Sequence, residues 1–218
     1  VVDSRYADHV VVITDCLVDF PNFPPSIQGV DVDHVVVVDE IGNPKKIASS
    51  AARFSTDPRD LLMAEYCAKV IEATPYFRDG FSFQTGAGGP SLAANRFLEP
   101  ILVKISWIIG GITAPAVDLL NKGLVGTIID TQDFDIAGIE SVHSHPRHFE
   151  MSTSQYASPG NKSAFVNKLD YVILAALEVD TDYNVNVITG SDGVLRGAPG
   201  GHPDTAAGAR CCIIVTPL

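Results

Sequence analysis

Residues 105–130 have the sequence ISWIIGGITAPAVDLLNKGLVGTIID, in which two apolar stretches flank a helical pattern. Residues 105–109 are mostly apolar and end at a glycine pair, which predicts a strand. Thr113, with a proline two residues later, marks the start of a helix, and Gly123 marks its end. Residues 125–130 form the next predicted strand. This order of strand, glycine turn, helix and strand is typical of a parallel α/β sheet.

The same pattern continues in both directions along the chain. Further strands are predicted at residues 10–13, 35–38, 81–84, 172–177, 185–188 and 211–215, and further helices at residues 58–73 and 90–98. The first two of these strands are rich in valine and are expected to be buried on both faces. Residues 141–163 are rich in proline, serine and histidine and are expected to be irregular. We therefore predict a single α/β domain over residues 1–218, with a mostly parallel sheet flanked by helices.

Composition excludes several classes of protein. The chain has 218 residues, is 46% hydrophobic and carries a formal net charge of −11. Such an acidic chain lacks the basic surface that nucleic acids require. No apolar run reaches the length of a membrane helix, and the first residues do not resemble a signal peptide. Four cysteines, at 16, 67, 211 and 212, have neither zinc-site nor disulfide spacing, so we expect a reducing, cytoplasmic location.

Two glycine-rich stretches are the main candidates for chemistry. Residues 84–91 (QTGAGGPS) follow a predicted strand and precede a helix, where backbone amides can bind an anion. They match neither a dinucleotide fingerprint nor a phosphate-binding lysine loop, so a tight turn is an equal alternative. Residues 189–209 contain a glycine pair before His202. A hairpin turn would explain Ser191-Asp192-Gly193, whereas the glycine pair favours an oxyanion hole built from backbone donors.

Three weaker candidates remain. Residues 110–113 are explained by a strand-to-helix turn. Glu178 ends an apolar strand, where a carboxylate is either a base or a solvated cap. His143, His145 and His148 suggest a metal, but no paired carboxylate or cysteine lies nearby in the sequence, so we expect a polar surface loop and no metal site. A GxSxG nucleophile motif is absent from the sequence.

Long blocks of the chain resemble the alpha subunits of citrate lyase. They are residues 11–47, 81–98, 110–120, 169–187 and 185–218, in the order of that family. The resemblance implies a domain of the ribose-5-phosphate isomerase/CoA-transferase type, forming the carboxyl-terminal half of a longer two-domain subunit. It also implies transfer of an acyl-carrier thioester from acetate to citrate. Acetyl-CoA, or a carrier protein with a phosphopantetheine-type arm, is then a substrate, and no tightly bound cofactor is expected.

The resemblance further implies partners and site residues. The partners are citrate, the acyl carrier protein (gamma subunit) and the beta subunit in a hetero-oligomer, without nucleic acid or membrane. Catalytic roles are expected for Gly200, Gly201, His202 and Glu178, with Glu178 supporting the others. Substrate or coenzyme A binding is expected for Gly86, Gly88, Gly89, Gly111, Thr113, Asn186, Ser191 and Asp204.

Departures from the wider transferase pattern bear on mechanism. Ala114 stands where related transferases carry a glutamate nucleophile, which favours direct attack of citrate on the thioester through a mixed anhydride. Pro199 and Pro203 replace expected serines beside the glycine pair. Two alternatives stay open: a CoA-transferase for citramalate or another acid, and a non-catalytic domain that docks the carrier. The active site is expected to need the other half of the subunit.

Overall fold

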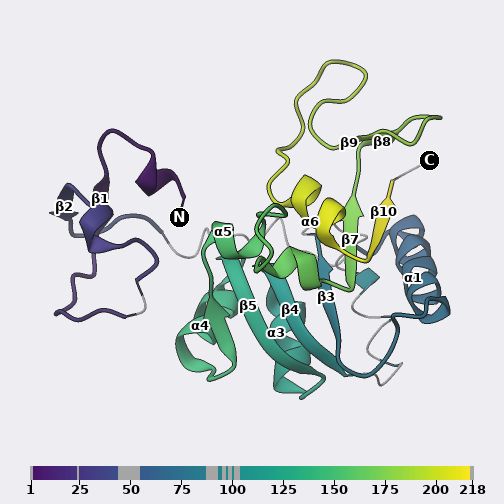
Figure 1. The fold of residues 1–218 in the computed structure, drawn as a ribbon, viewed down its shortest axis with the longest axis horizontal. Helices are drawn as coiled ribbons and strands as arrows, with labels where there is room; N and C mark the ends of the chain where they lie inside the picture. Colours follow the sequence, from purple (N-terminus) through teal and green to yellow (C-terminus); the bar gives the residue numbers. More distant parts are fainter. Residues whose placement is uncertain are drawn as a thin grey trace.

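A six-stranded parallel sheet forms the centre of the chain, in the order β10-β7-β3-β4-β5-β6 (Figure 1). The computed structural model describes residues 2–23, 25–43, 55–86, 93–94, 97, 100 and 104–216. The strands are β3 (Phe81–Thr85), β4 (Ile105–Ile112), β5 (Val125–Asp133), β6 (His148–Glu150), β7 (Tyr171–Ala175) and β10 (Cys211–Val215). The predicted α/β class with a mostly parallel sheet is confirmed.

Both faces of this sheet are buried, because successive side chains of a strand point to opposite faces. Ile108 belongs to one hydrophobic core and Ile109 to the other, as do Ile173 and Val172. The first core is covered by α1 (Pro58–Ala73) and α3 (Ala114–Asn121). The second is covered by α5 (Thr153–Tyr156), η5 (Phe165–Lys168) and α6 (His202–Gly208). Burial on both faces explains why β7 (YVILA) and β10 (CCIIV) are apolar runs without alternation.

Aspartates fix where three of the helices begin. Asp57 accepts a hydrogen bond from Arg59 N over 2.8 Å and caps α1, whose first residue is a proline, as predicted. Asp135 caps two helices with one carboxylate. Its Oδ1 accepts from Gly138 N in α4 (Ile136–Ser144) over 3.0 Å, and its Oδ2 accepts from Ala114 N in α3 over 2.7 Å. Asp135 thereby fixes α4 against α3.

The order of the strands places a topological switch point between β3 and β7, at the carboxyl end of the sheet. The chain enters the sheet at β3 and moves outward through β4, β5 and β6. It then crosses to the other side of β3, where β7 and β10 lie. The connections that follow β3 and β7 therefore leave in opposite directions, and ligands of open α/β sheets bind at such a position.

The first forty residues form a small unit of their own. It contains η1 (Asp3–Arg5), β1 (Val11–Thr14), η2 (Gly29–Asp31) and β2 (His34–Val37). β1 and β2 pair in parallel as a separate sheet, which Figure 1 shows to one side of the main sheet. The prediction that these strands are buried on both faces is wrong. Val11 is 52% exposed and Val37 57%, because no layer of the described residues covers them.

The predicted irregular stretch, residues 141–163, is more ordered than expected, since it holds the end of α4, β6 and α5. The predicted strand 185–188 is shorter and forms β9 (Val185–Asn186), which pairs antiparallel with β8 (Glu178–Val179). Most of the predicted helix 90–98 lies outside the described residues. Among the helices that the structure describes, none is long and apolar enough to span a bilayer.

Candidate functional site

Two of the segments selected from the sequence meet at the carboxyl ends of β3 and β7. Gly86, which follows β3, donates its amide to the carbonyl of Ile173 in β7 over 2.8 Å. The His202 ring at the start of α6 contacts the carbonyl of Ala175, the last residue of β7, over 3.2 Å. The structure thus brings residues near 86 and 202 to the carboxyl-terminal part of β7.

A tyrosine that the sequence analysis did not select holds these segments together. Gln84 Nε2 in β3 donates to the hydroxyl of Tyr156 in α5 over 2.7 Å. A Cβ on Gly110 would lie 3.0 Å from Gln84 Cδ and 3.2 Å from the Tyr156 hydroxyl. A Cβ on Gly201 would lie 2.7 Å from the same hydroxyl. Only glycine allows both backbones to approach the Gln84–Tyr156 pair this closely.

The Gln84–Tyr156 pair is buried and polar. Burial, with a smaller contribution from the nearby Asp204 carboxylate, raises the pKa of the Tyr156 hydroxyl to about 12, although the hydrogen bond from Gln84 acts in the opposite direction. The hydroxyl is therefore protonated at neutral pH. Gln84 Oε1 is buried without a hydrogen-bond partner among the described residues. An acceptor in this position can receive a hydrogen bond from a ligand.

The glycine turn at residues 199–202 offers fewer free amides than the sequence analysis expected. The His202 amide donates to the carbonyl of Pro199 over 2.9 Å. It is thus engaged in the turn and is not free to donate to an oxyanion in this conformation. Gly200 has a φ of +49° in the left-handed region, and Gly201 is the N-cap of α6. No hydrogen bond from either glycine amide is found among the described residues.

The His202 ring has a defined orientation. A carbonyl only accepts hydrogen bonds, so the 3.2 Å contact with Ala175 O requires the proton on Nε2. When the ring carries a single proton, Nδ1 is then the nitrogen that can accept a hydrogen bond. His202 is partly buried in α6, whose first turn also carries Asp204.

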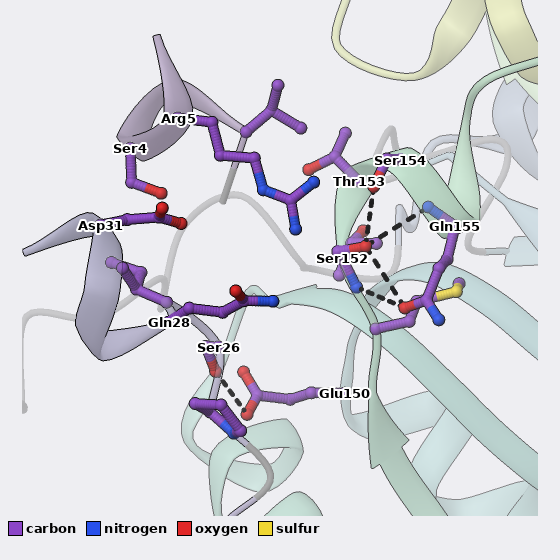
Figure 2. A pocket seen from close by; sticks show the side chains of 15 residues that line it. Ser4, Arg5, Ser26, Gln28, Asp31, Glu150, Ser152, Thr153, Ser154 and Gln155 are labelled. Carbon is purple, nitrogen blue, oxygen red and sulfur yellow. Dashed lines mark hydrogen bonds between the residues drawn. The ribbon is translucent and has the colours of Figure 1, made fainter. Parts of the chain in front are cut away.

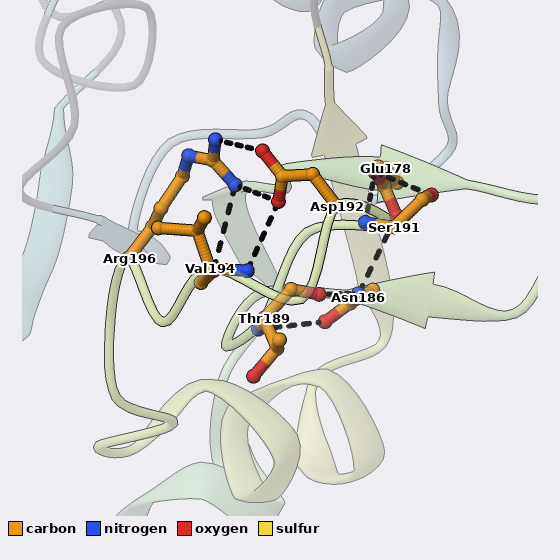
Figure 3. A network of polar contacts seen from close by, with 7 residues as sticks. All are labelled: Glu178, Asn186, Thr189, Ser191, Asp192, Val194 and Arg196. Carbon is orange, nitrogen blue, oxygen red and sulfur yellow. Dashed lines mark hydrogen bonds and ion pairs between the residues drawn. The ribbon is translucent and has the colours of Figure 1, made fainter.

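Glu178 is a fixed carboxylate in the β8–β9 hairpin (Figure 3). Its Oε1 accepts from both the amide and the hydroxyl of Ser191, each over 2.7 Å. The amide of Ser191 contributes most to lowering the pKa of Glu178, followed by the Ser191 hydroxyl. A carboxylate stabilised in this way is a weaker base and nucleophile than a free one, which agrees with a supporting role.

Asn186 serves the same hairpin rather than an open cavity. Its Oδ1 accepts from the amides of Ile188 and Thr189, and its Nδ2 donates to the Thr189 carbonyl. Asp192 and Arg196 form an ion pair further along the turn (Figure 3). The side chains of Asn186 and Ser191, both expected to bind substrate, are therefore engaged within the protein.

Two further predicted binding residues, Gly111 and Thr113, lie in β4 and just after it. Gly111 belongs to β4, and a Cβ there would lie 1.8 Å from a ring carbon of Phe134. Thr113 is buried at the N-cap of α3, without a side-chain cap bond. Both residues have evident packing roles. Gly88 and Gly89 lie outside the described residues.

A cavity of about 440 Å³ lies between the first thirty residues and α5 (Figure 2). Its lining includes Arg5 from one side and Ser152, Thr153 and Ser154 from the other. Asp31 and Glu150 also line it. With one cation against two carboxylates, the lining does not favour a multiply charged anion.

A cluster of potential metal ligands lies at β5 and β6. It consists of Asp130, Asp133 and His148. The expectation that His148 belongs to a polar surface loop is wrong, because it begins β6 and is 3% exposed. His143 is exposed, as expected. The two carboxylates near His148 come from a strand more than ten residues earlier, so the spacing of the histidines gave no sign of them.

Comparison with known proteins agrees with this architecture. The family model of the citrate lyase alpha subunit (CitF) matches residues 1–218. The citrate lyase alpha chain of Klebsiella pneumoniae is 52% identical over 221 residues, which cover 100% of this chain and 44% of that protein. The chain therefore spans less than half the length of the curated relatives it matches.

Solved structures extend the comparison. An alpha subunit of citrate lyase from Streptococcus mutans, in complex with citrate, has a TM-score of 0.89 and 50% identity. The match covers 98% of this chain and 43% of that one. A 4-hydroxybutyrate CoA-transferase from Porphyromonas gingivalis has a TM-score of 0.55 at 17% identity, covers 98% of this chain and 58% of its own, and shares the fold alone. By its full-length match to the family model and its identity to these relatives, the chain belongs to the citrate lyase alpha subunit family.

Proposed function

We propose that the protein containing this chain transfers an acyl-carrier thioester from acetate to citrate. Family membership supports citrate-related acyl transfer, and the solved relative from Streptococcus mutans is a complex with citrate. The observation that carries the proposal is the meeting of the end of β3, through Gln84, and the glycine turn at Gly201 at the Tyr156 hydroxyl. This arrangement presents backbone amides at the carboxyl end of the sheet, where a thioester carbonyl would be bound.

The proposed reaction has two steps without an acyl-enzyme. A carboxylate of citrate attacks the acetyl thioester carbonyl, the C–S bond breaks, and a mixed citric–acetic anhydride and a thiolate form. The thiolate then attacks the citryl carbonyl of the anhydride, and acetate leaves with the former bridging oxygen. Ala114 supports this route, since alanine offers no nucleophile at the position of the glutamate in related transferases. Glu178 is an unsuitable substitute, because its lowered pKa and two bonds from Ser191 reduce its nucleophilicity.

The chain's own residues would position the reactants and stabilise charge. The amides of Gly200 and Gly201 are the proposed donors to the oxyanion that develops at the thioester carbonyl. His202 Nδ1 is a proposed acceptor for a hydroxyl of citrate or of the carrier arm. Gln84 Oε1 is a second proposed acceptor, since it is buried beside the turn. Loss of one oxyanion donor typically costs a factor of about 10²–10³ in kcat.

Activity is proposed to require the part of the protein outside this chain. The exposed apolar strands β1 and β2 support this proposal, because parallel strands are normally covered on both faces. We further propose assembly with an acyl carrier protein and a lyase beta subunit in the cytoplasm. The four cysteines, all free, are compatible with a reducing compartment.

The proposal is tested with the full-length protein, acetyl-CoA and citrate, with citramalate in a parallel reaction. Mass spectrometry should detect citryl-CoA and acetate that depend on citrate. Product with citramalate alone would move the assignment to another carboxylic acid. Acetyl-CoA binding without product from either acid would favour a domain that docks the carrier.

Labelled oxygen tests the mechanism separately. In a single turnover with carboxyl-¹⁸O citrate, direct anhydride exchange places ¹⁸O in the first acetate released. An enzyme glutamate that formed its own anhydride would instead retain ¹⁸O and give unlabelled first acetate. Label on the protein, located by peptide mass spectrometry, would overturn the direct route and identify the nucleophile.

A further inference from the structure

Asp130, Asp133 and His148 converge on the face of the sheet that α4 covers. Ile128 pairs with His148 and Asp130 pairs with Glu150, so Asp130 and His148 lie on the same face of neighbouring strands. Asp133 follows at the end of β5. One potential ligand atom from each of the three residues lies within 4.8 Å of the others. Asp130 is 1% exposed and His148 is 3% exposed.

His148 is oriented by a hydrogen bond from α4. Its Nδ1 lies 2.9 Å from the Ser141 hydroxyl, while its Nε2 is buried without a hydrogen-bond partner among the described residues. Burial, and then the charge of His145, lower the pKa of His148 to about 4. The ring is therefore neutral at neutral pH. If Nδ1–H donates to Ser141, Nε2 presents its lone pair to the two carboxylates, which is how metal-binding histidines are fixed.

The two carboxylates are also incompletely satisfied. Asp130 Oδ1 and Asp133 Oδ1 are buried without hydrogen-bond partners, and no ion pair to either group is found within the described ranges. Burial, and then the charge of Asp133, raise the pKa of Asp130 to about 8. The site is built closely around these oxygens, because a Cβ on Gly138 would lie 2.4 Å from Asp133 Oδ1. Two buried carboxylates in contact require a cation or a proton between them.

We propose that oxygens of Asp130 and Asp133 together with His148 Nε2 bind one divalent transition-metal ion, which fastens β6 and α4 to β5. Two carboxylates and a neutral imidazole supply two negative charges, which a divalent ion neutralises. Oxygen and imidazole ligands without thiolates suit ions of the manganese-to-zinc series. The role is structural, since two of the three ligands are almost fully buried. This site is independent of the proposed transferase activity.

The competing explanation is a proton shared between Asp130 and Asp133. Replacing Asp130 by asparagine separates the two explanations. In a shared-proton pair, D130N keeps a donor for Asp133 and removes the repulsion, so stability is unchanged or raised. In a metal site, D130N removes a charged ligand and abolishes stabilisation by the ion.

The experiment uses the full-length protein, stripped with a chelator and then dialysed separately against Zn²⁺, Mn²⁺ and Co²⁺. After desalting, elemental mass spectrometry should find about one ion per chain, as expected for a single ligand set. D130N and H148Q should lose the ion. S141A should bind it about 10–100-fold more weakly, because the second-shell bond to Nδ1 is lost. Cobalt should give visible absorption in the wild type and not in H148Q.

H143Q is the matched control, because His143 is an exposed histidine of the same sequence motif and lies outside the cluster. It should bind the ion as the wild type does. Equal uptake by wild type and H148Q, or no uptake by any form, would overturn the proposal. If D130N fails to fold, D133N at the partly exposed ligand provides the same test, and its unchanged metal content would also contradict the site.

Discussion

Gln84 donates a hydrogen bond from Nε2 to the Tyr156 hydroxyl over 2.7 Å, and this bond joins the end of β3 to α5. The same hydroxyl fills the space beside Gly201, so the glycine turn before α6 packs directly against Tyr156. Three segments that are more than forty residues apart therefore depend on one tyrosine. The position of Gly201, one of the two proposed oxyanion donors, is set by packing against Tyr156.

Tyr156→Phe should destabilise the protein. It removes the hydroxyl and leaves Gln84 Nε2 buried without an acceptor, which costs about 1–3 kcal/mol. Denaturation by urea measures this loss as a lower midpoint with an unchanged slope. Tyr183→Phe is the control, because Tyr183 is 84% exposed and its replacement should leave the midpoint unchanged. Equal midpoints for the two variants would show that the Gln84–Tyr156 bond contributes nothing to stability.

Gly201→Ala should lower the kcat of the proposed exchange reaction, while the protein remains folded with a lowered urea midpoint. The new methyl group would contact the Tyr156 ring and displace the turn from its position against Tyr156, and overpacking of this kind costs about 1–3 kcal/mol. The measurements are kcat with acetyl-CoA and citrate, and the urea midpoint. Gly160→Ala is the matched control, since nothing lies within 4 Å of a Cβ there. Full activity in Gly201→Ala would remove this turn from the proposed site.

Asp135→Ala should cost more than the loss of an ordinary helix cap. One cap typically contributes about 1 kcal/mol, and Asp135 accepts from the first turns of both α3 and α4. We therefore expect a loss of about 2 kcal/mol in the free energy of unfolding. Asp135→Asn keeps one acceptor oxygen and should lose about half as much. A larger loss in the asparagine variant than in the alanine variant would contradict double capping.

Glu178→Gln tests the hairpin through its pH dependence. The folded pKa of Glu178 is lowered by Ser191, so the carboxylate stabilises the fold above the unfolded pKa of about 4.3. That stabilisation is lost as the pH falls through the lower folded value. The glutamine variant should lose stability at neutral pH and show a weaker acid transition. Hydrogen exchange of the Ser191 amide is the local measurement, and unchanged protection would contradict the proposed hairpin contact.

Local signals were sufficient for much of the architecture. The strand at 105–112 and the cap at Asp57 depend on neighbouring residues, and both occur close to where they were predicted. The burial of β1 and β2 could not be predicted, since it depends on what covers them. His148 was misassigned for a related reason. Its ligand-like environment depends on Asp130, eighteen positions earlier, and only the pairing of β5 with β6 brings the two together.

The site was partly predictable in the same sense. Glycine turns after strands have local signatures, so residues near Gly86 and Gly201 could be selected from the sequence. Tyr156 had no such signal, because a tyrosine in a short polar segment is usually a surface or packing residue. The roles expected for Asn186 and Ser191 came from the family resemblance, and their engagement within the hairpin depends on bonds that only the folded chain has.

The metal-free protein should become less stable as the pH rises from about 6.5 to about 8. Burial and Asp133 raise the folded pKa of Asp130 to about 8, so the folded state keeps a proton that the unfolded state has released. Between pH 4 and 6.5 the loss of stability with rising pH is opposed by His148. Its folded pKa is lowered to about 4, so in this range the unfolded chain binds a proton that the folded chain does not bind. Above the unfolded histidine value of about 6.5 only the carboxylate remains.

Urea midpoints measured across this range in the presence of a chelator test the sign. Asp133 does not alter the expected direction, since burial raises its pKa only to about 6 and it has released its proton below this window. The pKa values of the cluster also depend on the charges of three neighbouring residues, Glu150, Asp135 and His145. These residues are the same in all the variants compared. D130N should remove the decline, whereas H143Q should retain it. The contrary result is a urea midpoint that rises between pH 6.5 and 8, equally in the metal-free wild type and in metal-free D130N. That result would show that Asp130 is ionised in the folded state without a metal.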